Sequence, residues 1–266
     1  MNILIACVNY NSYPELNNYL VSIDRAAGVC SGLSVSVVVA DNSAERKDID
    51  GSLYKNIQTE ICILNNLGYL GGAQYVINKC ENIRQYDYVI ISNVDIEMPS
   101  NFFQKLEKYR CEDNIAWIAT KIWSHEEARD RNPKILSRYS KKKLEIINLM
   151  YKYPILDYLY NKTLYKRKVA YIPKPEMDLY AGHGSFMILT KAFFSHYKRI
   201  DYPIFLFGEE LYLAELIRKA NLRVHYVPDL EVIDKEHVST GKMRKSFYYK
   251  CNKESIDYIL KRFYNE

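Results

Sequence analysis

The feature that most constrains the fold is a set of short, very apolar segments that alternate with helical patterns. In the run from Val35 to Ala40, every residue except Ser36 is Val or Ala. A strand without a polar face is typical of a parallel sheet that is covered on both sides. The strand-like segments are residues 2–8, 34–40, 60–64, 88–92 and 115–122, and the helical patterns between them are 13–27, 72–84 and 99–110. This alternation predicts an α/β fold with a doubly wound, mostly parallel central sheet and an active site at the carboxyl ends of its strands.

The length of 266 residues fits one large α/β domain with a full core, so we expect residues 1–266 to form a single unit. The second half of the chain continues with strand-like segments at 185–189 and 223–227 and helical patterns at 208–220 and 246–264.

A basic stretch interrupts this pattern at residues 138–168. It carries nine Lys or Arg residues and only two acids, and aliphatic and aromatic residues lie between them. A basic helix with an aromatic–aliphatic face is typical of an interfacial membrane anchor. The same composition fits an insertion that packs its apolar face on the domain and leaves its lysines in water. Both interpretations stay open.

The six cysteines are scattered and include no C-x-x-C pair. This spacing argues against a zinc site or a disulfide framework and fits a reducing cytosol. No apolar run approaches the roughly 20 residues that span a bilayer, and the short apolar N-terminus is typical of a first strand. We therefore expect a cytoplasmic protein, with contact at the inner face of the cell membrane as the open alternative.

Two polar segments follow the first two strands. The loop after strand 2–8 contains no glycine, whereas a nicotinamide dinucleotide site needs a G-x-G-x-x-G loop there, so a dehydrogenase is not expected. Its polar atoms can instead border a nucleoside. After the second strand, Asp41-Asn42-Ser43 can accept hydrogen bonds from a ribose or a base, or can form an ordinary turn.

Two further segments follow later strands. The glycines of residues 66–72 allow a ligand close to the backbone, although a flexible loop before a helix has the same composition. Asn93-Val94-Asp95 follows a very apolar strand, and a carboxylate there can hold Mg²⁺ or Mn²⁺ against a diphosphate.

A pair of acids, Glu209 and Glu210, begins the helical pattern at 208–220. Acids at a helix start are favourable in any case. After an aromatic run, however, burial can raise a carboxylate pKa toward that of a useful base. Because adjacent helical residues point about 100° apart, we expect at most one of the two to face a reacting centre.

The order and spacing of these segments resemble the family 2 glycosyltransferases of the GT-A fold, in particular the bacterial rhamnosyltransferase-like branch. The resemblance extends over about residues 2–240 and leaves the basic insertion and the C-terminal helix largely unexplained. The matching motifs are Val8-Asn9-Tyr10-Asn11, Asp41-Asn42-Ser43, Asn66 to Gly72, Asn93-Val94-Asp95, Gly182-His183-Gly184 and Glu209-Glu210.

The resemblance implies a role for each motif. Asp95 would hold the metal, and Glu210, beside Glu209, would be the base that deprotonates the acceptor hydroxyl. Three residues, Gly182, His183 and Gly184, would border the donor sugar and the acceptor. The residues implied to bind the nucleotide and its diphosphate are Val8, Asn9, Tyr10, Asn11, Asp41, Asn66, Gly68, Asn93 and Val94.

Three positions depart from the family pattern. Asn93 replaces the first Asp of the D-x-D element, which leaves fewer acidic ligands, and Glu210 replaces an aspartate of similar chemistry. Asp234 stands where the family often has a histidine that binds metal. Asp234 or His237 could serve as that ligand, or neither of them.

We expect four parts of the chain. The resemblance implies a nucleotide-binding half (1–125) and an acceptor and catalytic half (170–240), and the residue pattern predicts a basic amphipathic insertion (138–168) and a C-terminal helix (242–266). The resemblance also implies an inverting transfer, with Mg²⁺ or Mn²⁺, from a UDP- or dTDP-sugar to a saccharide acceptor, lipid-linked, in surface polysaccharide, O-antigen or capsule synthesis.

Two alternatives stay open, a nucleotide-sugar binding protein that has lost catalysis and a sugar nucleotidyltransferase. The second fits less well, because the first loop has neither the glycines nor the basic residues that a triphosphate needs. No nucleic-acid partner is expected, because the one basic stretch is typical of a membrane helix rather than a groove.

Overall fold

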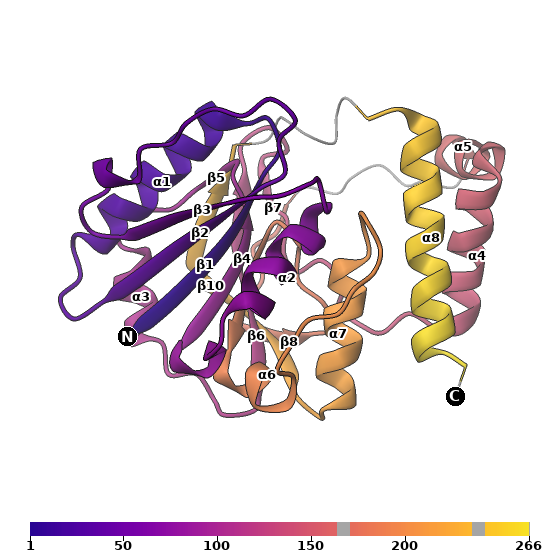
Figure 1. Ribbon diagram of the computed structural model, residues 1–266. Coiled ribbons are helices and arrows are strands. Elements are labelled where there is room, and N and C mark those ends of the chain that lie inside the picture. Colours follow the sequence, from indigo (N-terminus) through magenta and orange to yellow (C-terminus); the bar gives the residue numbers. More distant parts are fainter. Residues whose placement is uncertain (164–170, 236–242, 266) are drawn as a thin grey trace.

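The computed structural model describes residues 1–163, 171–235 and 243–265 of the chain. One ten-stranded sheet carries helices on both faces, and a further group of helices stands to one side of it (Figure 1). The strands are β1 (Asn2–Asn9), β2 (Ser34–Asp41), β3 (Gln58–Ile63), β4 (Tyr88–Asn93), β5 (Ile96–Glu97), β6 (Ile115–Ser124), β7 (Arg129–Asp130), β8 (Met177–Leu179), β9 (Phe186–Thr190) and β10 (Arg223–Asp234). The helices are α1 (Tyr13–Ala27), α2 (Tyr69–Lys79), α3 (Phe102–Lys108), α4 (Lys141–Lys152), α5 (Pro154–Thr163), α6 (Lys191–His196), α7 (Glu209–Lys219) and α8 (Lys245–Phe263), with short 3₁₀ turns at Gly51–Leu53 and Ile83–Gln85.

The main path of the sheet has the order β3-β2-β1-β4-β9-β6-β10-β5. Strands β3, β2, β1 and β4 are parallel, and β6 is parallel to β10. Between β4 and β6, β9 runs antiparallel to both, so the six long strands share one direction. The prediction of a doubly wound, mostly parallel sheet is confirmed, whereas the reversed direction of β9 was not predicted.

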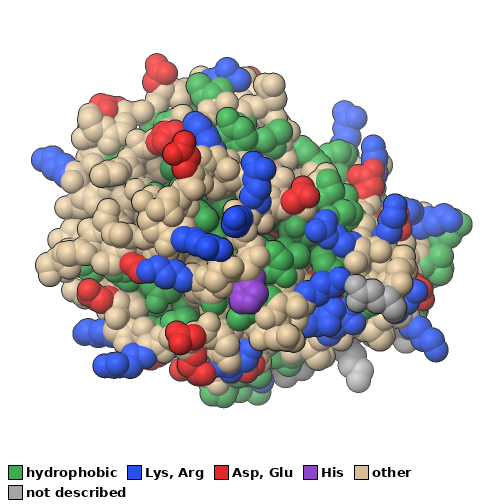
Figure 2. All heavy atoms as spheres, turned by 60° about the horizontal axis from the view of Figure 1, so that its bottom comes forward, with side chains coloured by type: hydrophobic (Ala, Val, Ile, Leu, Met, Phe, Trp, Pro, Cys, Tyr) green, Lys and Arg blue, Asp and Glu red, His purple; other side chains and the backbone are tan. Residues whose placement is uncertain are grey.

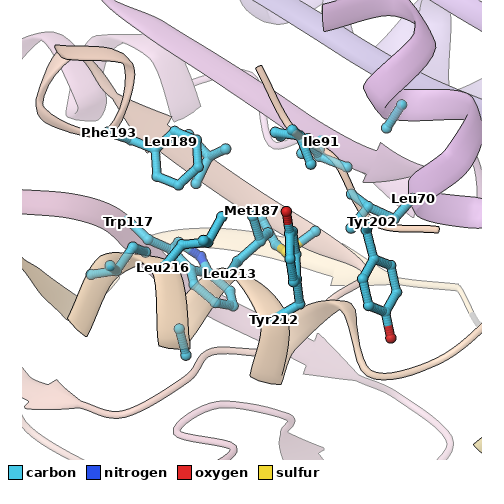
Figure 3. Packing of buried hydrophobic residues seen from close by; sticks show 14 of the residues in the cluster. Leu70, Ile91, Trp117, Met187, Leu189, Phe193, Tyr202, Tyr212, Leu213 and Leu216 are labelled. Carbon is cyan, nitrogen blue, oxygen red and sulfur yellow. The ribbon is translucent and has the colours of Figure 1, made fainter. Parts of the chain in front are cut away.

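Two apolar cores, one on each face, hold the helices to the sheet. On one face, α1 and α3 pack residues such as Leu20 and Phe103 onto Ile5 of β1. On the other face, α2, α6 and α7 cover Trp117 and its neighbours (Figure 3). Figure 3 shows Leu213 of α7 next to Trp117, and both side chains are fully buried. A strand that is covered on both sides needs apolar residues at consecutive positions, which explains the Val-rich runs.

Helices α4, α5 and α8 form a helical layer beside α7 (Figure 1). Up to Thr163, where the described part of the basic insertion ends, the insertion is mainly helical, and it divides into α4 and α5 at Pro154. A proline ring cannot continue a preceding helix and is well tolerated at a first helical turn. Ser140 begins α4 as an N-cap, because its side chain accepts a hydrogen bond from the backbone N–H of Lys143.

A buried ion pair links this layer to α7. Glu215 of α7 is fully buried, and its Oε1 accepts hydrogen bonds from Nε of Arg138 and from the Tyr180 hydroxyl, both at 2.6 Å. Arg138 also donates to the backbone oxygen of Phe263 at the end of α8, and its guanidinium lies 3.8 Å from the centre of the Tyr264 ring. Burial opposes ionisation of Glu215, but these hydrogen bonds hold its pKa below the usual value.

The two sides of the insertion have different environments. Leu144 of α4 is fully buried, and α4 packs along α8. The opposite side is exposed to solvent and includes Ile146, Ile155 and Tyr158. Each of these three residues is more than half exposed. Figure 2 shows lysine and arginine side chains beside hydrophobic ones on the side of the helical layer. Within the described ranges, no helix is both long and apolar enough to cross a membrane.

Candidate active site

A cavity of about 1340 Å³ opens at the carboxyl ends of the parallel strands. The loops after β1 and β4, the end of β10 and the first turn of α7 form one side of it, and the beginning of α8 forms another. Twelve of the predicted site residues line this cavity: Val8, Tyr10, Asn66, Gly68, Asn93, Val94, Asp95, His183, Gly184, Glu209, Glu210 and Asp234. The sequence motifs therefore meet in one place, although they are spread over more than 220 residues.

Asn9 and Asp41 lie behind the cavity wall. Asp41 is almost fully buried, and its two carboxylate oxygens accept hydrogen bonds from side chains of this chain: Asn9 at 3.0 Å, Ser43 at 2.6 Å and the Tyr13 hydroxyl at 2.8 Å. These bonds fix the two loops after β1 and β2 against each other. Asn11 lies exposed at the same edge, where its backbone N–H donates to Ser43. A contact of these residues with a nucleoside stays a prediction.

Gly68 can only be a glycine. It begins α2 with φ +77°, and a Cβ atom there would lie 1.7 Å from the backbone oxygen of Phe205. Asn42 belongs to the Asp41-Asn42-Ser43 motif, but the sequence assigns it no role of its own. It lines the cavity and holds this loop, because its Oδ1 accepts from the N–H of Leu67 and its Nδ2 donates to the oxygen of Gly68. The glycine-rich loop is therefore a fixed wall rather than a flexible connection.

Asp95 has the properties of a metal ligand. Its Oδ1 is buried and has no hydrogen-bond partner in the described parts of the chain. Burial, and next the charge of Asp234, raise the pKa of Asp95 to about 6. A divalent cation would satisfy this oxygen and reverse the shift. No cluster of three or more His, Cys, Asp or Glu side chains suited to a metal exists among residues 1–163, 171–235 and 243–265. Mg²⁺, however, is often held by one or two carboxylates together with substrate phosphates and water, so the donor set fits.

Asp234 occurs in an ion pair at the edge of the same site. Its Oδ2 lies 2.8 Å from Nη1 of Arg131, and its side chain is almost fully buried. The carboxylate that stands at the family's histidine position is therefore already balanced by a cation of the chain. His237, the alternative ligand, lies outside the described residues. Metal binding by either residue stays a prediction.

Glu210 is held by the backbone of the segment Gly182-His183-Gly184, called the glycine segment below. Its Oε1 accepts a hydrogen bond from the N–H of Gly184 at 3.2 Å and lies 3.5 Å from Nζ of Lys134. The Tyr69 hydroxyl donates to the oxygen of Gly184 at 2.6 Å and so fixes this segment to α2. A Cβ atom on Gly184 would lie 3.0 Å from the carboxylate oxygens of both Glu209 and Glu210, so the glycine allows two acids to approach the backbone.

The environment of Glu209 differs from that of Glu210. Burial, and next the charge of Glu210, raise the pKa of Glu209 to about 8. Two adjacent carboxylates that are both partly desolvated do not ionise together easily. Burial therefore favours the protonated form of Glu209, and Lys134 lies beside the pair.

The two other members of the glycine segment face different ways. His183 lines the cavity, and burial, followed by the charges of Lys134 and Arg131, holds its pKa well below the usual value, so its ring is neutral. Gly182 packs into the core, where a Cβ atom would lie 2.8 Å from Cβ of Ala119. A contact of Gly182 with the donor sugar or the acceptor stays a prediction.

Several lining residues were not found from the sequence. The most important are Arg131 and Lys134, which place two cations beside the acids of the cavity. No motif marks them, because they lie in an irregular segment between β6 and α4. The aromatic segment 205–207 and the first turns of α8 also line the cavity.

No protein-family model matches the sequence, and no curated protein matches it. Solved structures do match in fold. The structure of S. aureus TarS residues 1–349 in complex with UDP-GlcNAc has a TM-score of 0.56 at 11% identity, and that of GalNAc-T7 with UDP, GalNAc and Mn²⁺ has a TM-score of 0.62 at 10% identity. Both alignments cover 100% of this chain, and they cover 68% and 48% of those proteins. A further S. aureus TarS structure has a TM-score of 0.53 at 12% identity, with 89% of this chain and 37% of that protein covered.

The fold is of the GT-A type, which confirms the fold class predicted from the sequence. At these identities, the likeness concerns the fold and not the reaction. The chain spans between about one third and two thirds of the length of these proteins. Membership in family 2 and in its rhamnosyltransferase-like branch stays a prediction.

The protonated state of Glu209 predicts how stability depends on pH. The folded protein raises this pKa from 4.5 to about 8, so between these values the folded state binds more protons than the unfolded state. The free energy of unfolding therefore falls as the pH rises from 4.5 to 8. Glu209→Gln removes this titration. Between pH 5 and pH 9, we expect the variant to gain about 2 to 4 kcal/mol relative to the wild type in urea unfolding.

Glu145→Gln is the matched control, because Glu145 is exposed on α4. An equal gain in both variants, or no gain in Glu209→Gln, would show that Glu209 is ionised in the folded protein.

Proposed function

We propose that the protein is an inverting glycosyltransferase that moves a sugar from a UDP- or dTDP-sugar to a saccharide acceptor in the synthesis of a surface polysaccharide, O-antigen or capsule. The observation that carries this proposal is the meeting of Asp95, the glycine-rich loop and the Glu209–Glu210 pair in one cavity at the strand ends. The TarS complex with UDP-GlcNAc and the GalNAc-T7 complex with UDP support a uridine nucleotide as the first donor to test. A place in family 2, in the rhamnosyltransferase-like branch, is part of the same proposal.

The donor would lie along the loops after β1, β3 and β4. Val8 and Tyr10 line the cavity and would border the nucleoside, and Asn66 and Gly68, which line it too, would border the diphosphate. Because Gly68 has no side chain, the backbone of Phe205 can lie against this loop, and Asn42 keeps the loop in place. Binding in a rigid loop costs little ordering of the protein.

Asp95 would hold the divalent cation, with the donor phosphates and water as further ligands, and Asp234 would lie nearby. Bound Mg²⁺ or Mn²⁺ supplies positive charge that offsets the charge on the departing diphosphate. Arg131 and Lys134 add permanent positive charge on the same side of the cavity. The printed contents of the GalNAc-T7 structure, which include Mn²⁺, support this choice of metal.

Glu210 would act as the base. It takes the proton of the acceptor hydroxyl while that oxygen forms a bond to the anomeric carbon and the bond to the diphosphate breaks. The N–H of Gly184 donates to Oε1 of Glu210 and Nζ of Lys134 lies 3.5 Å from the same oxygen, so both groups orient the carboxylate, and burial favours the protonated form of Glu209 beside it. The displacement inverts the anomeric centre and needs no covalent intermediate.

Glu210→Gln tests the base. The amide keeps the size of the side chain but cannot take a proton, so we expect turnover to fall by about 10² to 10⁴. Nucleotide binding, measured by thermal shift with UDP, dTDP, GDP and CDP, is expected to persist, because the acid lies on the acceptor side.

Glu145→Gln serves again as the control and is expected to keep full turnover. Substantial turnover in Glu210→Gln would refute the assignment of the base, even if nucleotides still bind.

Asp95→Asn tests the metal. A nucleotide that binds the folded state raises the melting temperature, and we expect Mn²⁺ to enlarge this shift in the wild type. In Asp95→Asn, the shift by the nucleotide alone is expected to remain, whereas the contribution of Mn²⁺ disappears. Asp113→Asn, at an exposed position, is the control and should behave like the wild type.

The same measurement separates the proposal from its two alternatives. A nucleotide shift without sugar transfer to any acceptor would favour a binding protein that has lost catalysis. A shift with nucleoside triphosphates and sugar phosphates, but not with diphosphates, would favour a nucleotidyltransferase. An Mn²⁺ effect that is equal in Asp95→Asn and the wild type would remove Asp95 from the metal site.

We also propose that the exposed side of α4 and α5 contacts the inner face of the cell membrane and brings the enzyme to a lipid-linked acceptor. The apolar surface at Ile146, Ile155 and Tyr158 lies next to the lysines that begin α4, a combination that favours anionic lipid.

A vesicle flotation assay with phosphatidylglycerol tests this contact. Each lysine near an anionic surface contributes about 1 kcal/mol, so changing Lys141, Lys142 and Lys143 to Gln should lower the membrane partition coefficient by about a hundredfold. The control changes Lys55, Lys108 and Lys198, three exposed lysines on other parts of the domain, and should leave binding nearly intact. Equal loss in both triple variants would point to net charge instead of a docking face.

A further inference from the structure

The two sides of the cavity have opposite charge. On the side of the strand ends and α7 lie four acids, Asp95, Glu209, Glu210 and Asp234, with two cations, Arg131 and Lys134, beside them. On the facing side, residues 205–207 and the first turns of α8 contribute aromatic and basic side chains and no acid to the lining. The donor half of the cavity, around Asp95, where a metal can balance phosphate, is therefore separate from a half that is positive without any metal.

Aromatic rings form the surface of this second half. The ring of Phe205 meets that of Phe247 with centroids 6.0 Å apart, and the ring of Phe207 meets that of Tyr248 at 5.3 Å, both in edge contacts. Phe247 and Tyr248 remain 40% and 39% exposed, so their faces are accessible from the cavity side of α8. Exposed aromatic faces suit the apolar C–H face of a sugar ring.

Two cations stand at the same wall. Arg244 is exposed at the beginning of α8, and within the described ranges it forms no ion pair with an acid. Lys250, one and a half turns later, lies 3.9 Å from Glu254 at the limit of an ion pair and is 69% exposed. A guanidinium binds phosphate oxygens in a bidentate manner, and an ammonium adds a second contact. The wall therefore pairs a surface for a sugar with a surface for a phosphate.

We propose that this wall, formed by Arg244, Lys250 and the ring pairs Phe205–Phe247 and Phe207–Tyr248, is the acceptor site, and that the acceptor is a saccharide that carries a phosphate. This inference rests on the proposed glycosyltransferase function. The sugar packs on the rings with a hydroxyl toward Glu210, and its phosphate lies between the guanidinium and the ammonium.

The phosphate can belong to a free saccharide phosphate or to a lipid headgroup. The wall continues into the helical layer, because Tyr248 contacts the ring of Tyr151 on α4 and the Tyr249 hydroxyl donates to Asp157 on α5. A phosphate that links a saccharide to a lipid would thus lie between the cavity and the exposed side of α4 and α5. Both sources share the chemistry that Arg244 and Lys250 recognise.

The test compares ligands that differ only in the phosphate. Hexose 1-phosphates and the matching methyl hexosides are titrated by ligand-observed NMR, with the donor half occupied by the nucleotide that stabilises the protein most. We expect the phosphate to improve the dissociation constant by about tenfold or more. The double variant Arg244→Gln, Lys250→Gln is expected to remove this difference and leave the methyl hexosides unchanged. Thermal shift by the nucleotide should persist in it.

Lys245→Gln is the control, because Lys245 is exposed in the first turn of α8 but does not line the cavity. The proposal is overturned if the phosphate gives no advantage, if the double variant keeps the advantage, or if Lys245→Gln loses as much. Failure of nucleotide binding in the wild type would instead overturn the proposed function. A second arm presents the same saccharide on a lipid phosphate in phosphatidylcholine vesicles. Preference for this form assigns the phosphate to a lipid, and equal binding assigns it to a free saccharide.

Discussion

The site depends on the reversed strand β9. Because β9 runs antiparallel between β4 and β6, the residues that precede it lie at the carboxyl ends of these two strands. The backbone N–H of Asn93 donates to the oxygen of Ser185 at 2.9 Å and joins the end of β4 to the beginning of β9. Gly184 therefore lies between the loop that carries Asp95 and the first turn of α7. With β9 parallel, the same segment would lie at the opposite edge of the sheet, far from Glu210.

Most of the fold could be predicted from the sequence, because buried strands and amphipathic helices leave strong patterns. The structure places α1 at the predicted 13–27 and most strands within about two residues of their predicted bounds. The direction of β9 could not be predicted, since a short apolar strand that is covered on both faces reads the same both ways. The full length of β10 was also missed. Its pairing with β6 skips residues between Val227 and Glu231, where Pro228 and Asp229 resemble a loop in the sequence.

The candidate site was predictable only where chemistry and position coincide in a short motif. Asp95 follows a strand, and Glu210 begins a helix. In an α/β fold both positions lie at the carboxyl ends of the strands, so the sequence places the two acids at the same edge of the sheet. The partners of these acids come from an irregular segment, and nothing local in the sequence brings Lys134 to Glu210 or Arg131 to Asp234. The sequence also shows that Asp41 is an acid at a strand end. It does not show that Asn9, Ser43 and Tyr13 donate hydrogen bonds to its oxygens. Such contacts depend on tertiary packing.

Helix α7 has two tasks on one rigid element. Its first turn carries Glu210 into the cavity, and less than two turns later Glu215 is bound to Arg138 and through it to the end of α8. A buried carboxylate that loses its cation is strongly unfavourable. The helical layer therefore cannot be replaced by that of another protein without an effect on α7. A chimera that took residues 138–163 from another protein would need a new cation for Glu215. Without one, α7 would shift, and Glu210 in its first turn would move with it. The position of Glu210 is in this way tied to the residue at position 138.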